Sequence, residues 1–487
     1  MDKVEAVLPA QGGAPAGGPG ADAPGRRTGR AGRFARRLDP WLLAAAFFSA
    51  YAALSVSRDR RMQTMSWDLG IFEQAVKAYA HLHAPVADLK GPGTDVLGDH
   101  FSPVTSLIAP FYRVFPTPVT LLVAQASLFA LAVVPVTRVA QRFLGRSRGC
   151  AVGAAYGLSW GVQRAVDFDF HEIAFAMPLL AFSLEAVLRG RWAVALWWAV
   201  PLILVKEDLG ATAAMIGVLV RLRTRPERRA GRGGTAGTYA LALVAFGVAA
   251  SVWEIRWLIP AFHGPGYDPF THINGEGAVA GHIPVVTAVH TLLWVLVPAG
   301  GLLALRSPLL IVTLPTLGWR FASHYPENWG TGWHYSAVLM PVVFLALVDA
   351  ARRSRSSRMP WLRSYASGAP AAAAGAALAL SAQLPLAGLT HASAYRVDAR
   401  TRAVQRLLDR IPDGATVESD VGPLSSLVRR TTVYWIGGSQ DVVPRYIALG
   451  DATDWRDDPV SHATALHPGF RYTVVANADN CLILRRV

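Results

Sequence analysis

Apolar runs recur along the chain between Trp41 and Leu389, and they constrain its fold more than any other feature. Apolar residues make up 52% of the 487 residues and charged residues only 16%, against about 25% charged in soluble domains. We expect an all-α polytopic membrane protein with about eleven transmembrane helices. Several runs are shorter than the ~20 residues that cross a bilayer, which implies tilt or local thinning. The runs lie at 41–57, 117–137, 149–163, 173–188, 192–205, 209–220, 238–259, 284–305, 308–319, 335–350 and 366–389.

The basic residues predict how these runs are oriented, because arginine and lysine favour the cytoplasmic side. Residues 1–40 are rich in Gly, Ala and Pro and end in RRTGRAGRFARR, which indicates a disordered cytoplasmic tail. The stretch 192–220 has arginine-rich flanks at 189–191 and 221–229, so both flanks are expected inside. It then forms two short spans with Lys206-Glu207-Asp208 at their outer tip. The net charge of +14 reflects topology, and no nucleic-acid partner is expected.

Three parts follow from this pattern. Residues 1–40 are the tail, and residues 41–389 are the membrane domain, with a long first outer loop at 58–103. Residues 390–487 are polar and contain an amphipathic segment that stops at Pro412, followed by alternating strand-like segments. We expect a small extracytoplasmic α/β domain, with either a structural or an acceptor-binding role. The protein should reside in the cell membrane with its N-terminus in the cytoplasm.

Four glycines repeat every fourth residue within one apolar run, at Gly149, Gly153, Gly157 and Gly161. This spacing lines one face of a helix with small residues and predicts close helix packing. The segment GLSWG at 157–161 matches the G-x-S-x-G sequence of a nucleophile elbow but not its structural context. It lies inside an apolar run and not at a strand-to-helix turn, so we discard it.

Histidine and acidic residues concentrate in the predicted outer loops, where any chemistry should lie. The first loop holds Asp68 in SWDLGIFEQ and an Asp-His pair in GDHFSP; the next holds VDFDFHE. Loop carboxylates are often merely solvated, but carboxylates beside histidines also suit a divalent metal ion. HEIAF lacks the second His of a zincin, and two cysteines exclude a Cys-based site. The candidate metal ligands are Asp99, His100, Asp169, His171 and Glu172.

A second group of polar residues abuts the apolar runs. Lys206 has a compact ammonium that suits contact with phosphate, although pairing with a neighbouring carboxylate explains it equally well. The aromatic, His-rich segments 262–277 and 320–337 fit either an interfacial belt or a sugar site. Loops 58–103, 164–172 and 206–208 should converge if they form one site. The candidate substrate-binding residues are Lys206, Glu207, Asp208, Arg320, His334 and Tyr335.

Five of these motifs occur in order and carry a family resemblance over about residues 40–350. WDLGIFEQ, GDHFSP, DFHE, LVKED and WHYSA resemble the recurring motifs of an uncharacterised bacterial family of polytopic membrane proteins, a domain of unknown function. That family in turn resembles GT-C glycosyltransferases, which take sugars from polyprenyl-phosphate carriers. Such enzymes keep an acidic residue in the first outer loop, where Asp68 stands. They often have paired acids there, whereas Leu69 and Gly70 follow Asp68.

The resemblance implies a membrane glycosyltransferase in which Asp68 is the general base toward an extracytoplasmic acceptor. The leaving phosphate needs positive charge, from Lys206, from Arg320 or from a bound divalent cation. The partners would be the lipid bilayer and a polyprenyl-phosphate sugar. The alternatives are a transporter or lipid flippase, and a non-enzymatic envelope protein. Transporters place their sites near the midplane within internal repeats, and the sequence shows neither feature.

Overall fold

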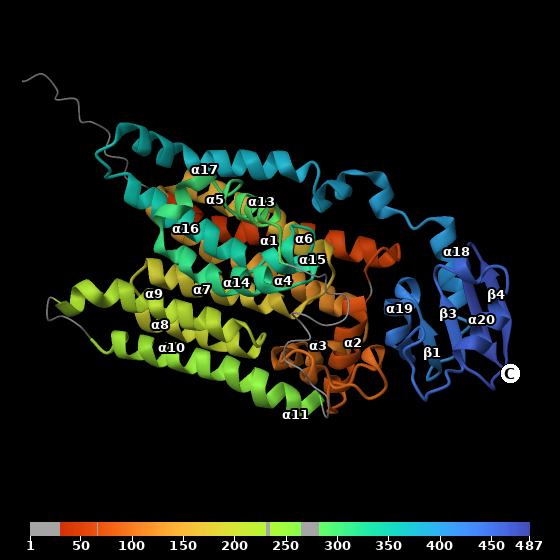
Figure 1. Cartoon of the computed structure of the whole chain (residues 1–487). Coiled ribbons are helices and arrows are strands. Elements are labelled where there is room, and N and C mark those ends of the chain that lie inside the picture. The colour runs from red at the N-terminus through yellow and green to blue at the C-terminus, as the bar shows by residue number, and fades with distance from the viewer. Residues whose placement is uncertain (1–29, 66, 230–233, 264–281) are drawn as a thin grey trace, which may run out of the picture.

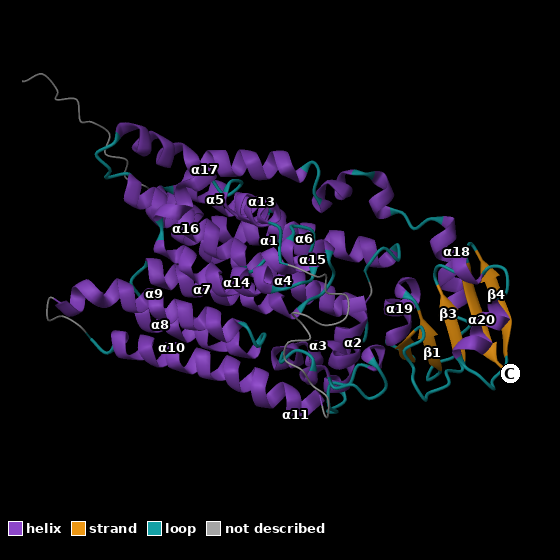
Figure 2. Ribbon diagram, viewed as in Figure 1, coloured by secondary structure: helices purple, strands orange, loops and turns teal. Residues whose placement is uncertain are grey.

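The computed structural model describes residues 30–65, 67–229, 234–263 and 282–487. The described chain is mostly helical, with one small sheet near the C-terminus (Figure 2). Most of the tail expected to be disordered, and most of segment 262–277, lie outside the described residues. Figure 1 shows an elongated helical bundle with the C-terminal domain at one end.

The bundle is built from helices that follow the apolar runs in order. Each of the eleven runs contains at least one helix, in several cases continued by a short 3-10 turn. The helices are α1 (Arg30–Arg60), α4 (Pro118–Leu144), α5 (Arg146–Gly157), α6 (Trp160–Asp167), α7 (Ala176–Leu188), α8 (Trp192–Ala199), α9 (Leu209–Arg229), α10 (Ala236–Trp253), α11 (Ile259–His263), α13 (Val285–Leu296), α14 (Leu314–Ala322), α15 (Pro326–Trp329), α16 (Leu339–Ser354) and α17 (Pro360–Ser381).

The count of eleven transmembrane helices is not confirmed. Among the described residues, three helices are long and apolar enough to span a membrane: Arg37–Arg60, Pro118–Leu144 and Ala236–His263. A fourth qualifies if the pair Pro326–Ser336 and Leu339–Ser354, bent by 69°, is one span. Of the other runs, 209–220 and 366–389 lie on the longer helices α9 (21 residues) and α17 (22 residues). Runs 192–205 and 308–319 are divided between a short helix and a 3-10 turn. Proline contributes to such breaks because it cannot donate the backbone hydrogen bond that would continue a helix. Pro201 is the second residue of the turn Val200–Leu204, and Pro308 is the first of the turn Pro308–Thr313.

Helix α5 packs closely on its neighbours through its glycines. A Cβ atom added at Gly149 would lie 2.3 Å from the Gln141 backbone nitrogen, and one at Gly153 would lie 2.0 Å from the Thr137 hydroxyl. No side chain fits at these distances, so the two glycines allow α5 to approach α4. The predicted packing face is therefore confirmed for Gly149 and Gly153, whereas Gly157 contacts Phe47 of α1 and Gly161 lies on the next helix, α6, against Met340.

Helix α2 (Trp67–Ala80) lies outside the bundle, next to α3 (Ala109–Val114) and the C-terminal domain (Figure 1). Its residues Leu69, Phe72 and Val76 pack against α3 and the start of α4. Ile71 and Ala75, on another face, pack against the C-terminal domain. The spacing of three and four residues between apolar positions produces these two faces on one helix.

The C-terminal domain contains the small sheet that the sequence predicts. Strand β1 pairs in parallel with β2 and β3, and β5 pairs antiparallel with β3 and β4, in the order β2-β1-β3-β5-β4. A hairpin joins β4 and β5, and Asp479 and Asn480 adopt positive φ at its turn. Its elements are α18 (Ala399–Leu408), β1 (Thr416–Ser419), α19 (Val421–Val428), β2 (Thr432–Trp435), β3 (Tyr446–Leu449), α20 (Pro459–Leu466), β4 (Tyr472–Ala478) and β5 (Cys481–Arg486).

Replacing Gln74 should loosen the junction between α2 and the C-terminal domain. The buried Gln74 amide donates to the Val433 carbonyl at 2.8 Å and accepts from the Leu89 backbone N–H at 3.1 Å. Gln74→Ala leaves two backbone groups without these partners, so we expect a loss of about 1–3 kcal/mol in the free energy of unfolding. Limited proteolysis should then release the C-terminal domain sooner than in the wild type.

Gln405→Ala is the matched control for this variant. Its amide also links the domain to the membrane part, by donating to the Arg60 carbonyl at 3.3 Å, but this bond is exposed. Water can replace an exposed partner, so proteolysis should be nearly unchanged. Equal sensitivity of the two variants would show that the Gln74 bonds do not hold the domain.

Candidate active site

Distant segments of the chain meet at the end of the bundle that faces the C-terminal domain. The Lys206 ammonium, before α9, donates to Glu172 Oε1 at 2.9 Å, and Glu172 follows α6. His100 Nδ1, in the first loop, lies 2.8 Å from Glu207 Oε1. The expected convergence of the three loops is thus observed.

A buried ion pair forms the centre of this cluster. The side chain of Glu172 is fully buried, and that of Lys206 is 14% exposed. Burial opposes the ionisation of Glu172, but His171 and Lys206 outweigh it and hold the pKa of Glu172 well below its usual range. Burial likewise opposes the charge of Lys206, and the carboxylates of Glu172 and Glu207 raise its pKa in spite of this. Both groups are therefore charged at neutral pH.

His171 completes the centre from the other side of Glu172. Its Nδ1 lies 2.6 Å from Glu172 Oε2, but without the geometry of a hydrogen bond. Neither of these buried atoms has a hydrogen-bond partner in the part of the chain that the structure describes. Its ring stacks on His334 at 3.8 Å. Burial and the neighbouring His171 keep the pKa of His334 well below its usual value, so His334 is neutral at physiological pH.

Asp68 lies in the first turn of α2, close enough to the centre to interact electrostatically with it. The side chain is half-buried. Burial raises the pKa of Asp68, and the charge of His171 offsets this only in part. Its carboxylate forms no hydrogen bond or ion pair with any residue the structure describes. A carboxylate held near a cationic centre without a partner of its own is available to a substrate.

The residue that holds the chain before Asp68 is Asp169. The Asp169 side chain accepts a hydrogen bond from the Met65 backbone N–H at 2.6 Å. The Asp169 carbonyl accepts from the Gln125 amide, whose oxygen in turn accepts from the His171 backbone N–H at 3.0 Å. Asp169 is buried with φ at +73°, a left-handed conformation that aspartate tolerates better than most residues. It thus joins the Asp68 segment to the loop that carries Glu172.

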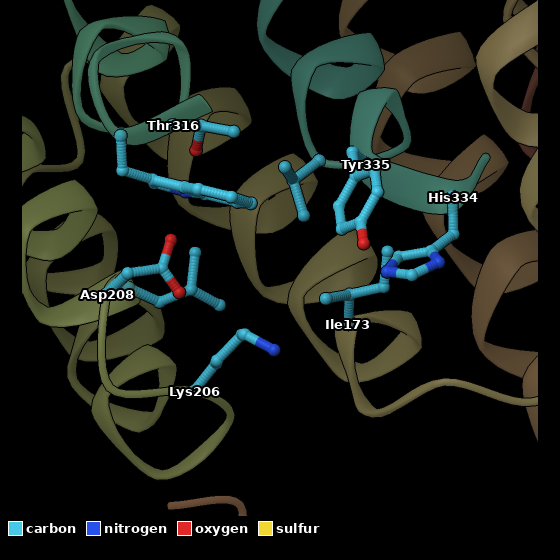
Figure 3. Close-up of a pocket in the computed structure, with 9 residues that line it drawn as sticks. Ile173, Lys206, Asp208, Thr316, His334 and Tyr335 are labelled. Atoms are coloured by element: carbon cyan, nitrogen blue, oxygen red, sulfur yellow. The ribbon is translucent and has the colours of Figure 1, made fainter. Parts of the chain in front are cut away.

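A pocket opens beside the ion pair and encloses about 330 Å³, open solvent at its mouth included. Figure 3 shows Lys206, Asp208 and Tyr335 pointing into the same space. Asp208 Oδ1, Trp319 Nε1 and His334 Nδ1 are buried there without a hydrogen-bond partner among the described residues. The pocket thus presents unpaired polar atoms to a ligand. Its lining residues are Ile173, Lys206, Asp208, Leu209, Thr316, Trp319, His334, Tyr335 and Val338.

The guanidinium of Arg320 forms its hydrogen bonds within the protein and does not line this pocket. Its guanidinium donates to the carbonyls of Asn328 and Gly330 and to the Ser336 hydroxyl, at 2.7–3.1 Å. It is fully buried and lies 5.9 Å from the centre of the Tyr335 ring. In this geometry Arg320 orders the loop that carries His334 and Tyr335. Another predicted substrate-binding residue, Glu207, is also used within the protein, because its carboxylate contacts His100 Nδ1 and accepts a hydrogen bond from the Phe101 N–H.

The structure does not assemble the predicted metal ligands into one set. Asp99 pairs with Lys90 at 2.5 Å. The other four predicted ligands make the separate contacts with neighbouring residues that are described above. In the described part of the chain, no three His, Cys, Asp or Glu side chains are arranged to hold a metal ion. The described residues therefore do not fit a metal ion in this geometry. The set comprises Asp99, His100, Asp169, His171 and Glu172.

Sequence reasoning did not single out Thr316 and Trp319, which line the pocket from α14. A signal for them exists. They are three residues apart at the end of a short apolar run, so they share one helix face. A hydroxyl and an indole N–H on the same face, directly before Arg320, mark a polar surface that points inward.

The chain belongs to the DUF2079 family of predicted membrane proteins, whose pattern matches residues 58–481. The crystal structure of ArnT from Cupriavidus metallidurans bound to undecaprenyl phosphate is similar, with a TM-score of 0.57 and 14% identity, over 90% of this chain and 97% of that chain. The structure of the same protein in the apo state gives a TM-score of 0.49 at 13% identity, over 85% and 92%. No curated protein matches the sequence. The first likeness shows that the chain has an ArnT-like fold.

Removing the positive charge of Lys206 should destabilise the protein strongly. Lys206→Met leaves the carboxylate of Glu172 fully buried without its cation, and breaking a buried pair in this way costs about 3–5 kcal/mol. Denaturant titration in mixed detergent micelles would measure this loss. The double variant Lys206→Met/Glu172→Gln removes both charges and should recover much of it. If Lys206→Met alone unfolds like the wild type, the pair does not exist as a buried contact.

Asp208 should make the stability of the protein fall as pH rises. Burial, and then the charge of Glu207, raise the pKa of Asp208 to about 6, against 3.8 for the ordinary group. Folding therefore favours the protonated form, and its contribution is present below about pH 4 and lost as the pH rises through about 6. Asp208→Asn resembles the protonated form, so it should be more stable than the wild type above about pH 7, by up to ~3 kcal/mol.

Melting temperatures measured from about pH 4 to 8 would test this dependence. Asp441→Asn, which removes an exposed carboxylate, is the control and should leave the wild-type profile unchanged. Parallel profiles for the wild type and Asp208→Asn would assign the pH dependence to another group.

Proposed function

We propose that the protein is a membrane glycosyltransferase that moves a sugar from a polyprenyl-phosphate carrier to an extracytoplasmic acceptor. The observation that carries this proposal is the Asp68 carboxylate, which has no partner among the described residues and interacts electrostatically with His171, Glu172 and Lys206, the last of which lines the polar pocket. The family resemblance of the motifs and the ArnT-like fold support it. That the ArnT structure was obtained with undecaprenyl phosphate supports a polyprenyl-phosphate partner here.

In the proposed reaction, an acceptor hydroxyl attacks the anomeric carbon of the sugar. Asp68 takes the proton of that hydroxyl, while the bond between the anomeric carbon and the phosphate oxygen breaks. The phosphate leaves on the lipid with an additional negative charge. General-base catalysis of this kind depends first on geometry, and a raised pKa brings the base closer to the operating pH.

Lys206 is the group that stabilises the leaving phosphate. Its ammonium has three donors, and one of them is used on Glu172. The remaining donors can reach a ligand, because the side chain lines the pocket. A cation fixed in advance in a site with little water stabilises developing charge without reorganisation. Glu172 and His171 then act as positioning residues that fix the ammonium.

The same proposal places the site and the C-terminal domain outside the cell. The arginine-rich C-terminal end of α9 lies at the end of the bundle away from the C-terminal domain (Figure 1). If arginine marks the cytoplasmic side, the site and its acceptor are on the outer side. This topology agrees with a reaction on a lipid carrier exposed at the outer surface.

Asp68→Asn should abolish most of the activity and leave the fold intact. The amide keeps the size and polarity of the side chain but cannot accept the proton, so turnover should fall by about 10²–10⁴-fold. Asparagine is as good as aspartate at a helix N-terminus, and melting should therefore change little. Each variant is expressed from a plasmid in a strain from which the chromosomal gene has been deleted. The assay then compares the lipid-linked sugars and envelope glycans of these strains with those of the strain that expresses the wild type.

Asp88→Asn is the matched control in the same loop. Its carboxylate accepts a hydrogen bond from the Gly93 N–H at 2.9 Å, which an asparagine oxygen can also accept. This variant should restore the wild-type glycan profile, whereas Asp68→Asn should leave the lipid-linked donor accumulated. Full restoration by Asp68→Asn at equal protein level would exclude Asp68 as the base. An unchanged glycan and lipid profile on deletion would contradict the proposed function itself.

A further inference from the structure

The segment between the first loop and α4 exposes an apolar face outside the long helices. It consists of the 3-10 turn Pro103–Ile108, helix α3 and the residues up to Thr117. The exposed fractions of Leu107, Phe111, Val114 and Phe115 are 61%, 66%, 68% and 65%. Phe111 and Val114 are three residues apart on one face of α3, Leu107 lies in the 3-10 turn before the helix, and Phe115 follows its last residue. Large exposed apolar patches of this kind mark an interaction surface.

The opposite side of this segment is already occupied by the protein. Ile108 and Tyr112 are 3% and 1% exposed and pack against Leu69 and Val76 of α2. The segment is therefore apolar on both sides, and its only charged residue is Arg113. A turn that faced water on its outer side would carry polar residues there. The composition of the apolar face instead matches a surface that faces lipid.

The position of the segment in the chain identifies the partner. Helix α4 begins at Pro118, directly after the segment, and is long and apolar enough to span a membrane. The segment thus lies where the chain enters the bilayer. With about 15 residues it is too short to cross, but amphipathic segments with Phe and Leu on one face lie in the plane of the interface. We propose that residues 103–117 dock on the membrane surface, with Leu107, Phe111, Val114 and Phe115 among the lipid chains.

Docking would fix the height of the candidate active site above the membrane. The Tyr112 hydroxyl, on the inner side of the segment, donates to Glu73 of α2 at 2.8 Å. Glu73 is five residues from Asp68 on the same helix. The segment therefore connects the lipid surface to Asp68, and a lipid-linked phosphate has its reacting group at that surface. This consequence rests on the proposed function, whereas the docking itself does not.

Spin-label accessibility tests the docking directly. Phe111→Cys in a background with Cys150→Ser and Cys481→Ser takes a nitroxide label, and the full chain is placed in vesicles of phosphatidylethanolamine and phosphatidylglycerol. Collisions with oxygen, which concentrates in hydrocarbon, are compared with collisions with a water-soluble nickel chelate. We expect an oxygen-to-nickel ratio several-fold higher than that of Phe470→Cys, a 42% exposed position in the C-terminal domain.

The outcome that overturns the proposal is a label at position 111 as accessible to nickel as the label at position 470. Shielding from both reagents, with dipolar broadening between labels, would also overturn it, because a second copy of the chain would then cover the face. Val114→Cys gives a second reading of the same apolar face if Phe111→Cys does not fold. The measurement needs no activity, so its failure is separate from the failure of the glycosyltransferase proposal.

Discussion

A buried carboxylate needs a positive charge or hydrogen-bond donors to replace the water that it has lost. The candidate active site depends on the ion pair in which Lys206 provides this charge to Glu172. Two charges buried together are held only if their geometry is good and their remaining atoms find partners. Here the pair joins the loop after α6 to the loop before α9. His171 adjoins the same carboxylate and carries His334 against its ring. The pair thus organises the walls of the pocket.

The position of Asp68 is set by contacts on two sides of α2. One face of the helix packs on α3 and the bundle, and the other packs on the C-terminal domain. Trp67, the residue before Asp68, meets Trp435 of the domain edge to face at 4.8 Å. A helix that is held from two sides can keep a half-buried carboxylate in place without a hydrogen bond to it. Through Trp67 and α2, the C-terminal domain is thus in contact with the segment that carries Asp68.

Much of the fold could be predicted from sequence because bilayers and helices impose simple periodic rules. The apolar runs predicted where helices occur, and the glycine spacing predicted how α5 packs on α4. The number of complete spans could not be predicted in the same way. Whether a broken run such as 192–205 crosses the membrane depends on how its neighbours cover the break. That is decided by packing and not by the hydropathy of the segment.

By itself, the sequence determined which residue types gather in the loops, because charge and histidine are excluded from the apolar runs wherever they have no partner. It therefore indicated Asp68, His171, Glu172 and Lys206 as one site. Only the tertiary structure decided their roles. It pairs Lys206 with Glu172 and commits the Arg320 guanidinium to Asn328, Gly330 and Ser336. Asp68 has no partner among the residues described. The physical reason is that pairing depends on the distances and burial of side chains from segments far apart in the chain, such as His100 and Glu207, which are separated by 107 residues. No local sequence pattern encodes such distances.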